Sequence, residues 1–252
     1  MSIKRGRDVG TYEEKVLHEI ILWQKKMSRK PSITGRLTKG IQRKVNNIIP
    51  DKVHNAITST IKNMVKAVLT GSEFISKKPI FDDKPLEERE MQVLKRASFY
   101  KKGAVASGVG TGAGGLLLGL ADFPLLLTLK IKFLFDTATL YGFDVSDFRE
   151  RLYILHLFEL AFSSQEKRAE VYERISNWDK KTNEIPSSLE TFDWRSFQQE
   201  YRDYIDLAKM MQLVPGIGSV VGAVTNYRLM DKLKETAMNG YRLRLLHRGD
   251  FK

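Results

Sequence analysis

The chain has 252 residues, of which 42% are hydrophobic, so it can form one large domain or two small ones with a substantial core. It contains no cysteine, which excludes structural disulfides, thiolate zinc sites and cysteine nucleophiles, and which is compatible with a reducing cytoplasm. Its net charge of +12 lies entirely in residues 1–102, with 23 Lys or Arg against 11 Asp or Glu, because residues 103–252 are balanced at 19 against 19.

Three amphipathic helices are predicted in the basic N-terminal part, over residues 12–27, 34–49 and 50–70. Gly71 is placed to end the third of them as a C-terminal cap. The second helix carries four basic residues off its apolar stripe, and these are predicted membrane contacts: Arg36, Lys39, Arg43 and Lys44. Basic amphipathic helices can lie on an anionic membrane, and the alternative is a solvated basic face on a helical core.

A charged helix is predicted over residues 86–102, and it ends in the basic pair Lys101 and Lys102 directly before a long charge-free segment. A basic pair at this place is typical of the cytoplasmic flank of a membrane segment, so both lysines are also predicted membrane contacts. Aromatic and basic residues are not interleaved as a nucleic-acid surface requires, so nucleic acid is not an expected partner.

Two Gly-rich apolar segments, residues 103–129 and 214–225, are the most unusual parts of the chain. Residues 103–121 contain no charge, and seven of these nineteen residues are glycine. Several glycines lie four apart, which places them on common helix faces and predicts close packing of helices. The glycines predicted to pack helices are Gly108, Gly110, Gly112, Gly114, Gly115, Gly119, Gly216, Gly218 and Gly222.

The first Gly-rich segment has other interpretations besides helix packing. Gly110, Gly112 and Gly115 match the nucleotide motif G-x-G-x-x-G, but a helix rather than a strand is predicted before them, so a nucleotide site is not favoured. Nineteen residues fall within the spanning range of about 17–25, yet Gly, Ser and Thr make the segment weakly hydrophobic. A spanning helix, a shallow insertion and a soluble core therefore stay open as alternatives.

A helix break is predicted near residues 120–123, because Asp122 can cap a helix N-terminus and Pro124 suits a first turn. The following helix is expected to run from Pro124 to about Tyr141. Asp122 and Asn226, the polar residues associated with the two Gly-rich segments, are predicted to be buried.

Three more helices and a C-terminal helix are predicted beyond Gly142, which is a plausible helix stop. The first is expected to begin after Ser146, as N-cap, and to end at Phe162, and the second covers residues 164–177, before a polar loop at 180–188. The third covers residues 193–213, and the C-terminal helix runs from about residue 226 to 248. No strand pattern is found. The sequence therefore predicts an all-α fold, a single domain of eight to ten helices around the two Gly-rich segments, with a basic N-terminal region (1–84) and a helical core (85–252).

No catalytic, cofactor-binding or metal-binding residue is predicted. His156 and Glu159 lie three apart on a predicted helix, a spacing that can share a metal, but no H-E-x-x-H or G-x-S-x-G motif is present. The sequence therefore favours a non-enzymatic protein, and no cofactor is expected.

Four segments together suggest a family: TGAGGLLLGLADFPLLL (111–127), YGFD (141–144), VPGIGSVVGAVTNY (214–227) and YRLR (241–244). In their order and over roughly residues 85–250, they resemble the EcsC family of bacterial proteins. The resemblance implies association with the Ecs ABC transporter, a system linked to protein secretion and processing. It implies no defined catalytic activity.

We therefore expect a membrane-proximal accessory or regulatory protein of an ABC transporter, cytoplasmic and peripheral at the inner face of the cell membrane. Its expected partners are the transporter subunits and an anionic membrane surface. One alternative is a soluble hydrolase-like enzyme with a pocket at the Gly-rich segments, centred on Asp122. Another is an integral membrane or pore-forming subunit, against which the charges of Lys130, Lys132 and Asp136 count.

Overall fold

A computed structural model describes residues 11–29, 51–71, 84–109, 115–164, 167–186, 188, 190 and 222–250. These residues form seven α-helices and one short 3-10 helix: α1 (Tyr12–Met27), α3 (Asp51–Thr70), α4 (Leu86–Val109), α5 (Gly115–Leu140), α6 (Phe148–Phe162), α7 (Arg168–Ser176), η1 (Asp179–Glu184) and α10 (Gly222–Arg248). The all-α fold class is confirmed for this part of the chain. The predicted total of eight to ten helices is not confirmed by it.

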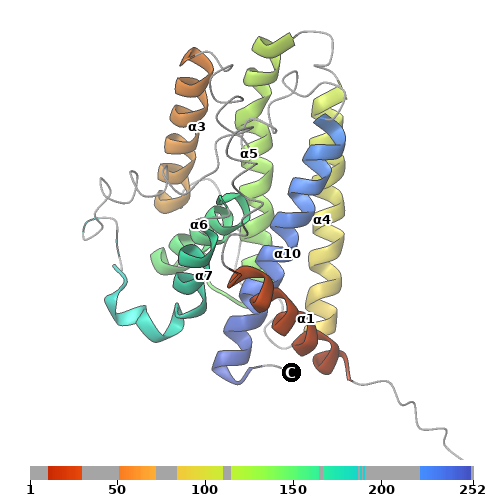
Figure 1. Cartoon of the computed structure of the whole chain (residues 1–252), viewed down its shortest axis with the longest axis vertical. Helices are drawn as coiled ribbons and strands as arrows, with labels where there is room; N and C mark the ends of the chain where they lie inside the picture. Colours follow the sequence, from red (N-terminus) through yellow and green to blue (C-terminus); the bar gives the residue numbers. More distant parts are fainter. Residues whose placement is uncertain are drawn as a thin grey trace, which may run out of the picture.

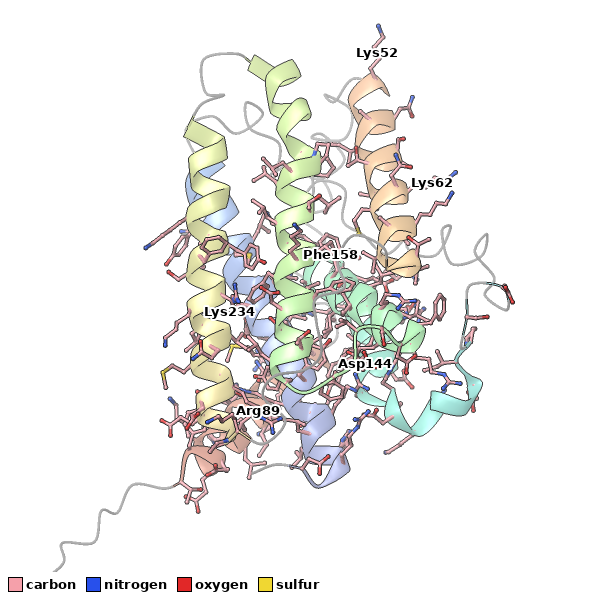
Figure 2. All side chains as sticks on the ribbon, turned by 180° about the vertical axis from the view of Figure 1, so that it is seen from behind. Lys52, Lys62, Arg89, Asp144, Phe158 and Lys234 are labelled. Carbon is pink, nitrogen blue, oxygen red and sulfur yellow. The ribbon has the colours of Figure 1, made fainter. Side chains whose placement is uncertain are left out.

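The long helices α4, α5 and α10 lie side by side along the length of the molecule (Figure 1). Helix α3 packs on α5 and α6, α7 packs on α6, and α1 packs on α10 near the end of the chain. Helix α6 lies in the interior, because all its residues except Arg149 are buried, and Phe158 is surrounded by the other helices (Figure 2). A helix that is buried all round must be enclosed by others.

Helices α1 and α3 agree with the predicted N-terminal helices. The side chain of Thr11 accepts a hydrogen bond from the Glu14 N–H, and Glu14 accepts one in return from the Thr11 N–H, so a capping box begins α1. Gly71 ends α3 with φ +74°, and its N–H donates to the Ala67 carbonyl at 3.0 Å. Only glycine adopts this left-handed conformation without a steric cost, which confirms the predicted cap.

The first Gly-rich segment is divided differently from the prediction. Helix α4 does not end at Lys102 but continues to Val109, and α5 begins at Gly115. The charge pattern gave the wrong end because α4 still packs beside α5 past its last charged residue: Gly103 is exposed, but a Cβ added to it would lie 3.8 Å from Leu129 of α5. Packing on α5 therefore extends the helix past its last charged residue.

The predicted break near residues 120–123 is wrong, because α5 runs without interruption from Gly115 to Leu140 with Pro124 inside it. Asp122 lies well inside this helix and cannot be its N-cap. Pro124 is exposed, whereas its neighbours Phe123, Leu126 and Leu127 are buried, so tertiary packing carries the helix through the proline. Asp122 and Pro124 are a typical pattern for a helix start, but burial of the adjacent apolar residues keeps the helix continuous.

Two smaller boundaries differ from the prediction. The N-cap of α6 is Asp147, which accepts from the Arg149 N–H at 2.8 Å, while Ser146 instead donates its N–H and hydroxyl to Asp144. The predicted polar loop at 180–188 is partly ordered as η1. Asn226 lies within α10 rather than before a helix, because α10 begins at Gly222.

Several predicted features lie outside the described residues. These are the predicted helices at 34–49 and 193–213, the basic residues Arg36, Lys39, Arg43 and Lys44, and the glycines Gly110, Gly112, Gly114, Gly216 and Gly218. The other predicted packing glycines lie on helices: Gly108 on α4, Gly115 and Gly119 on α5, and Gly222 on α10. Among the described helices, none combines the length and apolar character needed to cross a bilayer.

Gly240 is a packing glycine that the sequence patterns did not single out. A Cβ at this position would lie 2.4 Å from Leu157 Cδ2 and 3.1 Å from the Tyr153 hydroxyl oxygen, which donates to the Gly240 carbonyl at 2.9 Å. Helix α10 therefore approaches α6 closely at Gly240, and a side chain here would push the two helices apart.

We predict that Gly240→Ala lowers the free energy of unfolding by about 1–3 kcal/mol, because the added methyl group overpacks the α6–α10 contact. Gly103→Ala is the matched control: its Cβ meets Leu129 at an ordinary 3.8 Å, so the helix-propensity gain of up to about 1 kcal/mol should dominate. Urea unfolding of both variants measures the difference. Equal stabilities would contradict close packing at Gly240.

Lys130 is a buried cation in the middle of α5. It is 1% exposed, and its ammonium finds no hydrogen-bond partner among the described residues. Burial lowers its pKa to about 8, because the charged form loses its hydration without an opposite charge in return. Folding is therefore opposed by Lys130 at neutral pH.

We predict that Lys130→Met raises stability by up to about 3 kcal/mol at neutral pH, and that this gain shrinks as the pH rises through about 8 to 10. Over that interval the unfolded chain keeps the Lys130 proton while the folded chain loses it, so the stability of the parent chain increases with pH. Urea unfolding of both proteins at several pH values measures this. A difference that stays constant from neutral pH to pH 10 would show that burial does not lower the Lys130 pKa.

Candidate functional site

Helix α10 carries two buried arginines, Arg242 and Arg244, each only 5% exposed. Residues two apart on an α-helix point in nearly opposite directions, because each residue turns the helix by about 100°. The two guanidinium groups therefore reach different neighbours, and each organises a separate buried cluster.

The first cluster is centred on Glu90 of α4, whose side chain is fully buried, and we call it the Glu90 cluster. Arg242 donates two hydrogen bonds to this carboxylate, from Nε at 2.6 Å and Nη2 at 2.5 Å. The hydroxyl groups of Tyr12 and Tyr141 donate to the same carboxylate at 2.5 and 2.8 Å. Arg242 also donates to Glu19 of α1 at 2.8 Å. One carboxylate thus joins α1, α4, the end of α5 and α10.

The second cluster, the Glu150 cluster, lies on the other side of α10. Arg244 donates to Glu150 of α6 at 2.6 Å, and Tyr241 donates to the second oxygen of that carboxylate at 2.7 Å. Arg244 also binds Asp179 of η1 at 3.1 Å, and Arg248 binds the same carboxylate at 2.9 Å. This cluster therefore fixes α6 and η1 to the C-terminal end of α10.

The two clusters are linked by stacked aromatic rings. Tyr241 stacks on Tyr141 with ring centres 5.5 Å apart and contacts Tyr153 edge-on at 5.4 Å. The Arg244 guanidinium lies over the rings of Phe143 and Tyr153, at 4.1 and 4.4 Å from their centres. Such contacts favour a cation held in a desolvated site.

The pKa shifts show that both clusters hold their charges firmly. Burial by itself would lower the pKa of Arg242, but its hydrogen bonds with Glu90 raise the pKa above the ordinary value. Burial and then the charge of Glu90 raise the pKa of Tyr141 well above its ordinary value. Burial would raise the pKa of Asp179, yet its bonds with Arg244 lower it. The arginines therefore stay charged and paired, which suits a structural role better than proton transfer.

The sequence shows that the C-terminal end of α10 is basic, but it does not show that two of these arginines are buried beside carboxylates. A signal was present for Arg244, which falls on the apolar stripe of Leu233, Ala237 and Tyr241, whereas Arg242 lies on the opposite side of the helix. A buried arginine needs hydrogen-bond acceptors, and a carboxylate is the acceptor that also balances its charge. The sequence could not show which carboxylates these are, because Glu90 lies 152 residues from Arg242 in the chain.

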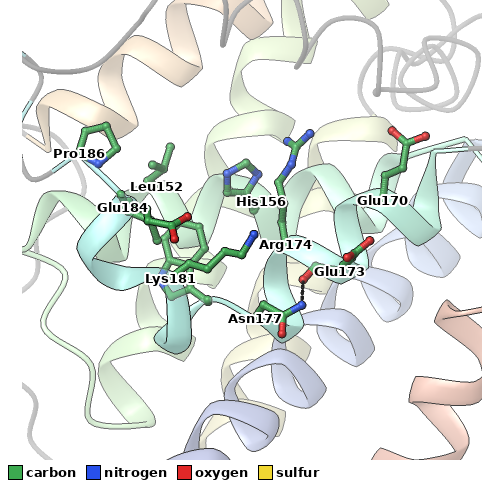
Figure 3. A pocket seen from close by; sticks show the side chains of 11 residues that line it. Leu152, His156, Glu170, Glu173, Arg174, Asn177, Lys181, Glu184 and Pro186 are labelled. Carbon is green, nitrogen blue, oxygen red and sulfur yellow. Dashed lines mark hydrogen bonds between the residues drawn. The ribbon is translucent and has the colours of Figure 1, made fainter.

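A cavity of about 490 Å³ lies beside these clusters, between α6, α7 and η1, and we call it the Trp178 pocket (Figure 3). Its lining residues are Leu152, His156, Glu170, Glu173, Arg174, Asn177, Trp178, Lys181, Glu184, Ile185 and Pro186. Trp178 also lines a second hollow of about 300 Å³, next to Arg244 of the Glu150 cluster. Of the predicted site residues that the structure describes, none lines either cavity.

His156 and Glu159, considered as a shared metal site from the sequence, bind each other instead. The His156 Nδ1 atom lies 2.7 Å from Glu159 Oε2, and Arg174 lies 4.0 Å from the same oxygen. Among the described residues, no group of three His, Asp or Glu side chains is arranged to hold a metal ion. The pair fixes the orientation of the His156 ring at the wall of the Trp178 pocket.

The two lysines predicted to contact a membrane at the end of the 86–102 segment have different surroundings. Lys101 is bonded to Asp231 of α10, and its ammonium lies 3.9 Å from the Tyr227 ring centre. Lys102 is exposed. Their contact with a membrane stays a prediction, and internal pairing makes Lys101 the less available of the two.

A basic surface that was not singled out from the sequence lies on α3. Lys52, Lys62 and Lys66 are exposed on the side opposite the buried stripe of Ile57, Ile61 and Val68 and other apolar residues, and none of the three pairs with a described acidic residue. Figure 2 shows Lys52 and Lys62 pointing away from the bundle. We call these three residues the α3 lysine face.

Comparison with known proteins identifies the family of this chain. The profile of the EcsC protein family matches residues 14–246. The chain belongs to the EcsC family. Protein EcsC of Bacillus subtilis (strain 168) is 44% identical over 236 residues, which cover 94% of this chain and 97% of that protein. The uncharacterized protein YdbA of the same organism is 26% identical over 247 aligned residues and 90% of each chain. No solved structure shows a significant match to this EcsC-family chain.

We predict that Arg242→Met lowers the free energy of unfolding of this EcsC-family chain by about 3–5 kcal/mol, because Glu90 is left buried without its cation. Lys26→Met is the control: its ion pair with Glu235 has a similar length, 2.8 Å, but both side chains are largely exposed, so the loss should stay below about 1 kcal/mol. Thermal and urea unfolding of the two variants give the comparison. A small effect at Arg242 would show that the Glu90 cluster does not stabilise the fold.

Proposed function

We propose that this chain is a non-enzymatic accessory or regulatory protein of an ABC transporter linked to protein secretion, held peripherally at the inner face of the cell membrane. Membership of the EcsC family supports the proposal, because the resemblance to that family implies an Ecs-type transporter. The structural observation that carries the membrane part is the α3 lysine face.

The α3 lysine face has the geometry of a surface that binds anionic lipid. Lys52, Lys62 and Lys66 are exposed on the side of a single helix that lies opposite its buried stripe. Near an anionic membrane surface each lysine contributes about 1 kcal/mol, so three of them give a binding energy of about 3 kcal/mol. This amount supports reversible attachment that salt can weaken, which is what a peripheral protein requires.

The distribution of the remaining charges supports a role in binding rather than catalysis. Arg242 and Arg244, the most deeply buried cations with partners, are committed to Glu90 and Glu150. Their carboxylate partners are each bonded to tyrosines as well. Such fully paired groups hold helices together, and they leave the surface lysines of the N-terminal part to contact a partner.

We predict that the triple variant Lys52→Glu, Lys62→Glu, Lys66→Glu binds anionic liposomes at least about 100-fold more weakly than the parent chain, because about 3 kcal/mol of attraction is lost and repulsion is added. Co-sedimentation with phosphatidylglycerol-containing liposomes at low salt measures the affinity. The control is Lys25→Glu, Lys95→Glu, Lys180→Glu, which changes three other exposed lysines by the same charge. If both triple variants lost the same affinity for liposomes, net charge alone would explain the effect, and the α3 lysine face would not be the membrane-binding surface.

The same variants test the cellular part of the proposal. In cell fractionation, the parent chain should sediment with membranes and be released by high salt, and a tagged chain should recover the transporter subunits from the membrane fraction. The α3 variant should move to the soluble fraction. Retention of the parent chain through alkaline carbonate would show insertion and contradict peripheral attachment. A fully soluble parent chain that recovers no transporter subunit would overturn the proposed function.

A further inference from the structure

One side of helix α4 carries large apolar side chains in contact with solvent. Met91, Leu94 and Phe99 are 46%, 47% and 65% exposed, whereas Val93 and Ala97 on the other side of the helix are buried. Single exposed apolar residues are normal on a protein surface, but a cluster of large ones marks a contact surface. The exposed side of α4 is therefore a candidate for contact with another molecule.

Charges of opposite sign lie at the two ends of the same side of α4. Glu87 and Glu88 are exposed in the first turn, and Lys102 is exposed about three turns after Met91 and on the same side of the helix. Glu87 and Lys102 form no ion pair with a described residue, and Glu88 forms only an exposed pair with Lys84 at 3.5 Å. We call the following residues the α4 face: Glu87, Glu88, Met91, Leu94, Phe99 and Lys102.

An anionic membrane does not fit the α4 face. Glu87 and Glu88 would be repelled by anionic lipid. Helices α3 and α4 also lie at opposite edges of the bundle with α5 between them (Figure 1), and Lys52 and Lys62 point away from the bundle on the α3 side (Figure 2). Because the α3 lysine face and the α4 face lie on opposite sides, they do not rest on one flat bilayer together.

The order of charges along the α4 face is self-complementary. A two-fold axis that crosses the helix between Leu94 and Lys95 places a second copy of α4 antiparallel to the first, and it brings together residues equally far from that point. Glu87 then lies level with Lys102 of the second copy, about 11 Å from the axis. The symmetry forms this pairing twice, once at each end of the contact.

The apolar side chains meet in the middle of the same arrangement. Met91 lies level with Phe99 of the second copy, and a thioether beside an aromatic ring is a favourable contact. Leu94 meets its own copy beside the axis. Ser98, which is exposed between these positions, is small enough to let the two helices approach closely. Lys95 also comes near its copy, but its long side chain can turn outward into solvent.

We propose that this chain forms a symmetric dimer with a second copy of itself through the α4 face, with the two α4 helices antiparallel. An unrelated partner would not require acidic and basic residues at equal distances from the middle of the helix, whereas a two-fold contact does. A contact made by one helix from each copy is small, so we expect a reversible dimer with a Kd of about 10–100 µM at low salt. This dimer is independent of the proposed attachment to a transporter and a membrane.

Charge reversal tests the pairing directly. Sedimentation equilibrium of the full chain, from about 5 to 300 µM, measures the Kd. The double variant Glu87→Lys, Glu88→Lys and the single variant Lys102→Glu should each be monomeric alone, because each brings like charges together at both ends of the contact. An equimolar mixture of the two should dimerise about as well as the parent chain, since opposite charges then meet at both ends. A variant that failed to fold would not be rescued in this way.

The apolar part of the face is tested by truncation. Leu94→Ala and Phe99→Ala should each weaken the dimer by at least about tenfold, because each side chain is buried in the centre of the contact. Leu22→Ala is the matched control: Leu22 of α1 is 52% exposed, but it lies outside the α4 face, so its loss should leave the Kd unchanged.

Three results would overturn the proposal. The first is a parent chain that stays monomeric up to about 300 µM, and the second is a mixture of the two charge variants that stays monomeric. The third is a monomeric chain whose binding to anionic liposomes is lost in Leu94→Ala and Phe99→Ala, which would make the α4 face a membrane contact. The α3 triple variant should dimerise like the parent chain, so a failure of membrane attachment is distinguished from a failure of dimerisation.

Discussion

The fold depends on the burial of one carboxylate, that of Glu90. A fully buried carboxylate is tolerated only when its charge is paired and its oxygens are hydrogen-bonded. Here Arg242, Tyr12 and Tyr141 together provide four donors, and they come from three different parts of the chain. The positions of α1, α4, α5 and α10 relative to one another are therefore set by a single desolvated group as well as by apolar packing.

Helix α10 extends this constraint to the other half of the molecule. Since Arg244 lies two residues from Arg242, the same helix reaches Glu150 of α6 and Asp179 of η1 on its other side. Gly240 lets α10 approach α6 closely just before the two arginines. One short segment thus combines close backbone packing, a tyrosine stack and two buried ion pairs, and it holds the end of the bundle that lines the Trp178 pocket.

This division of charge separates structure from binding. The deeply buried charges of α4, α6 and α10 are paired with one another, so they stabilise the scaffold and are not available to a ligand. The three lysines of the α3 lysine face are exposed and form no ion pair with a described residue. These lysines are therefore available for contacts outside the chain, while the buried charges are not.

The sequence by itself determined the helical fold class, the apolar stripe of α1 and the cap at Gly71, because these depend on side-chain period and on local backbone conformation. It determined the family as well, through short segments in a fixed order. It could not determine the course of α5 through Pro124, the end of α4 or the partners of Arg242 and Arg244. These depend on burial against residues far away in the chain. The helix continues through Pro124 because the residues beside the proline are packed in the core, and Arg242 and Arg244 are each stabilised by a carboxylate that only the tertiary structure brings to it.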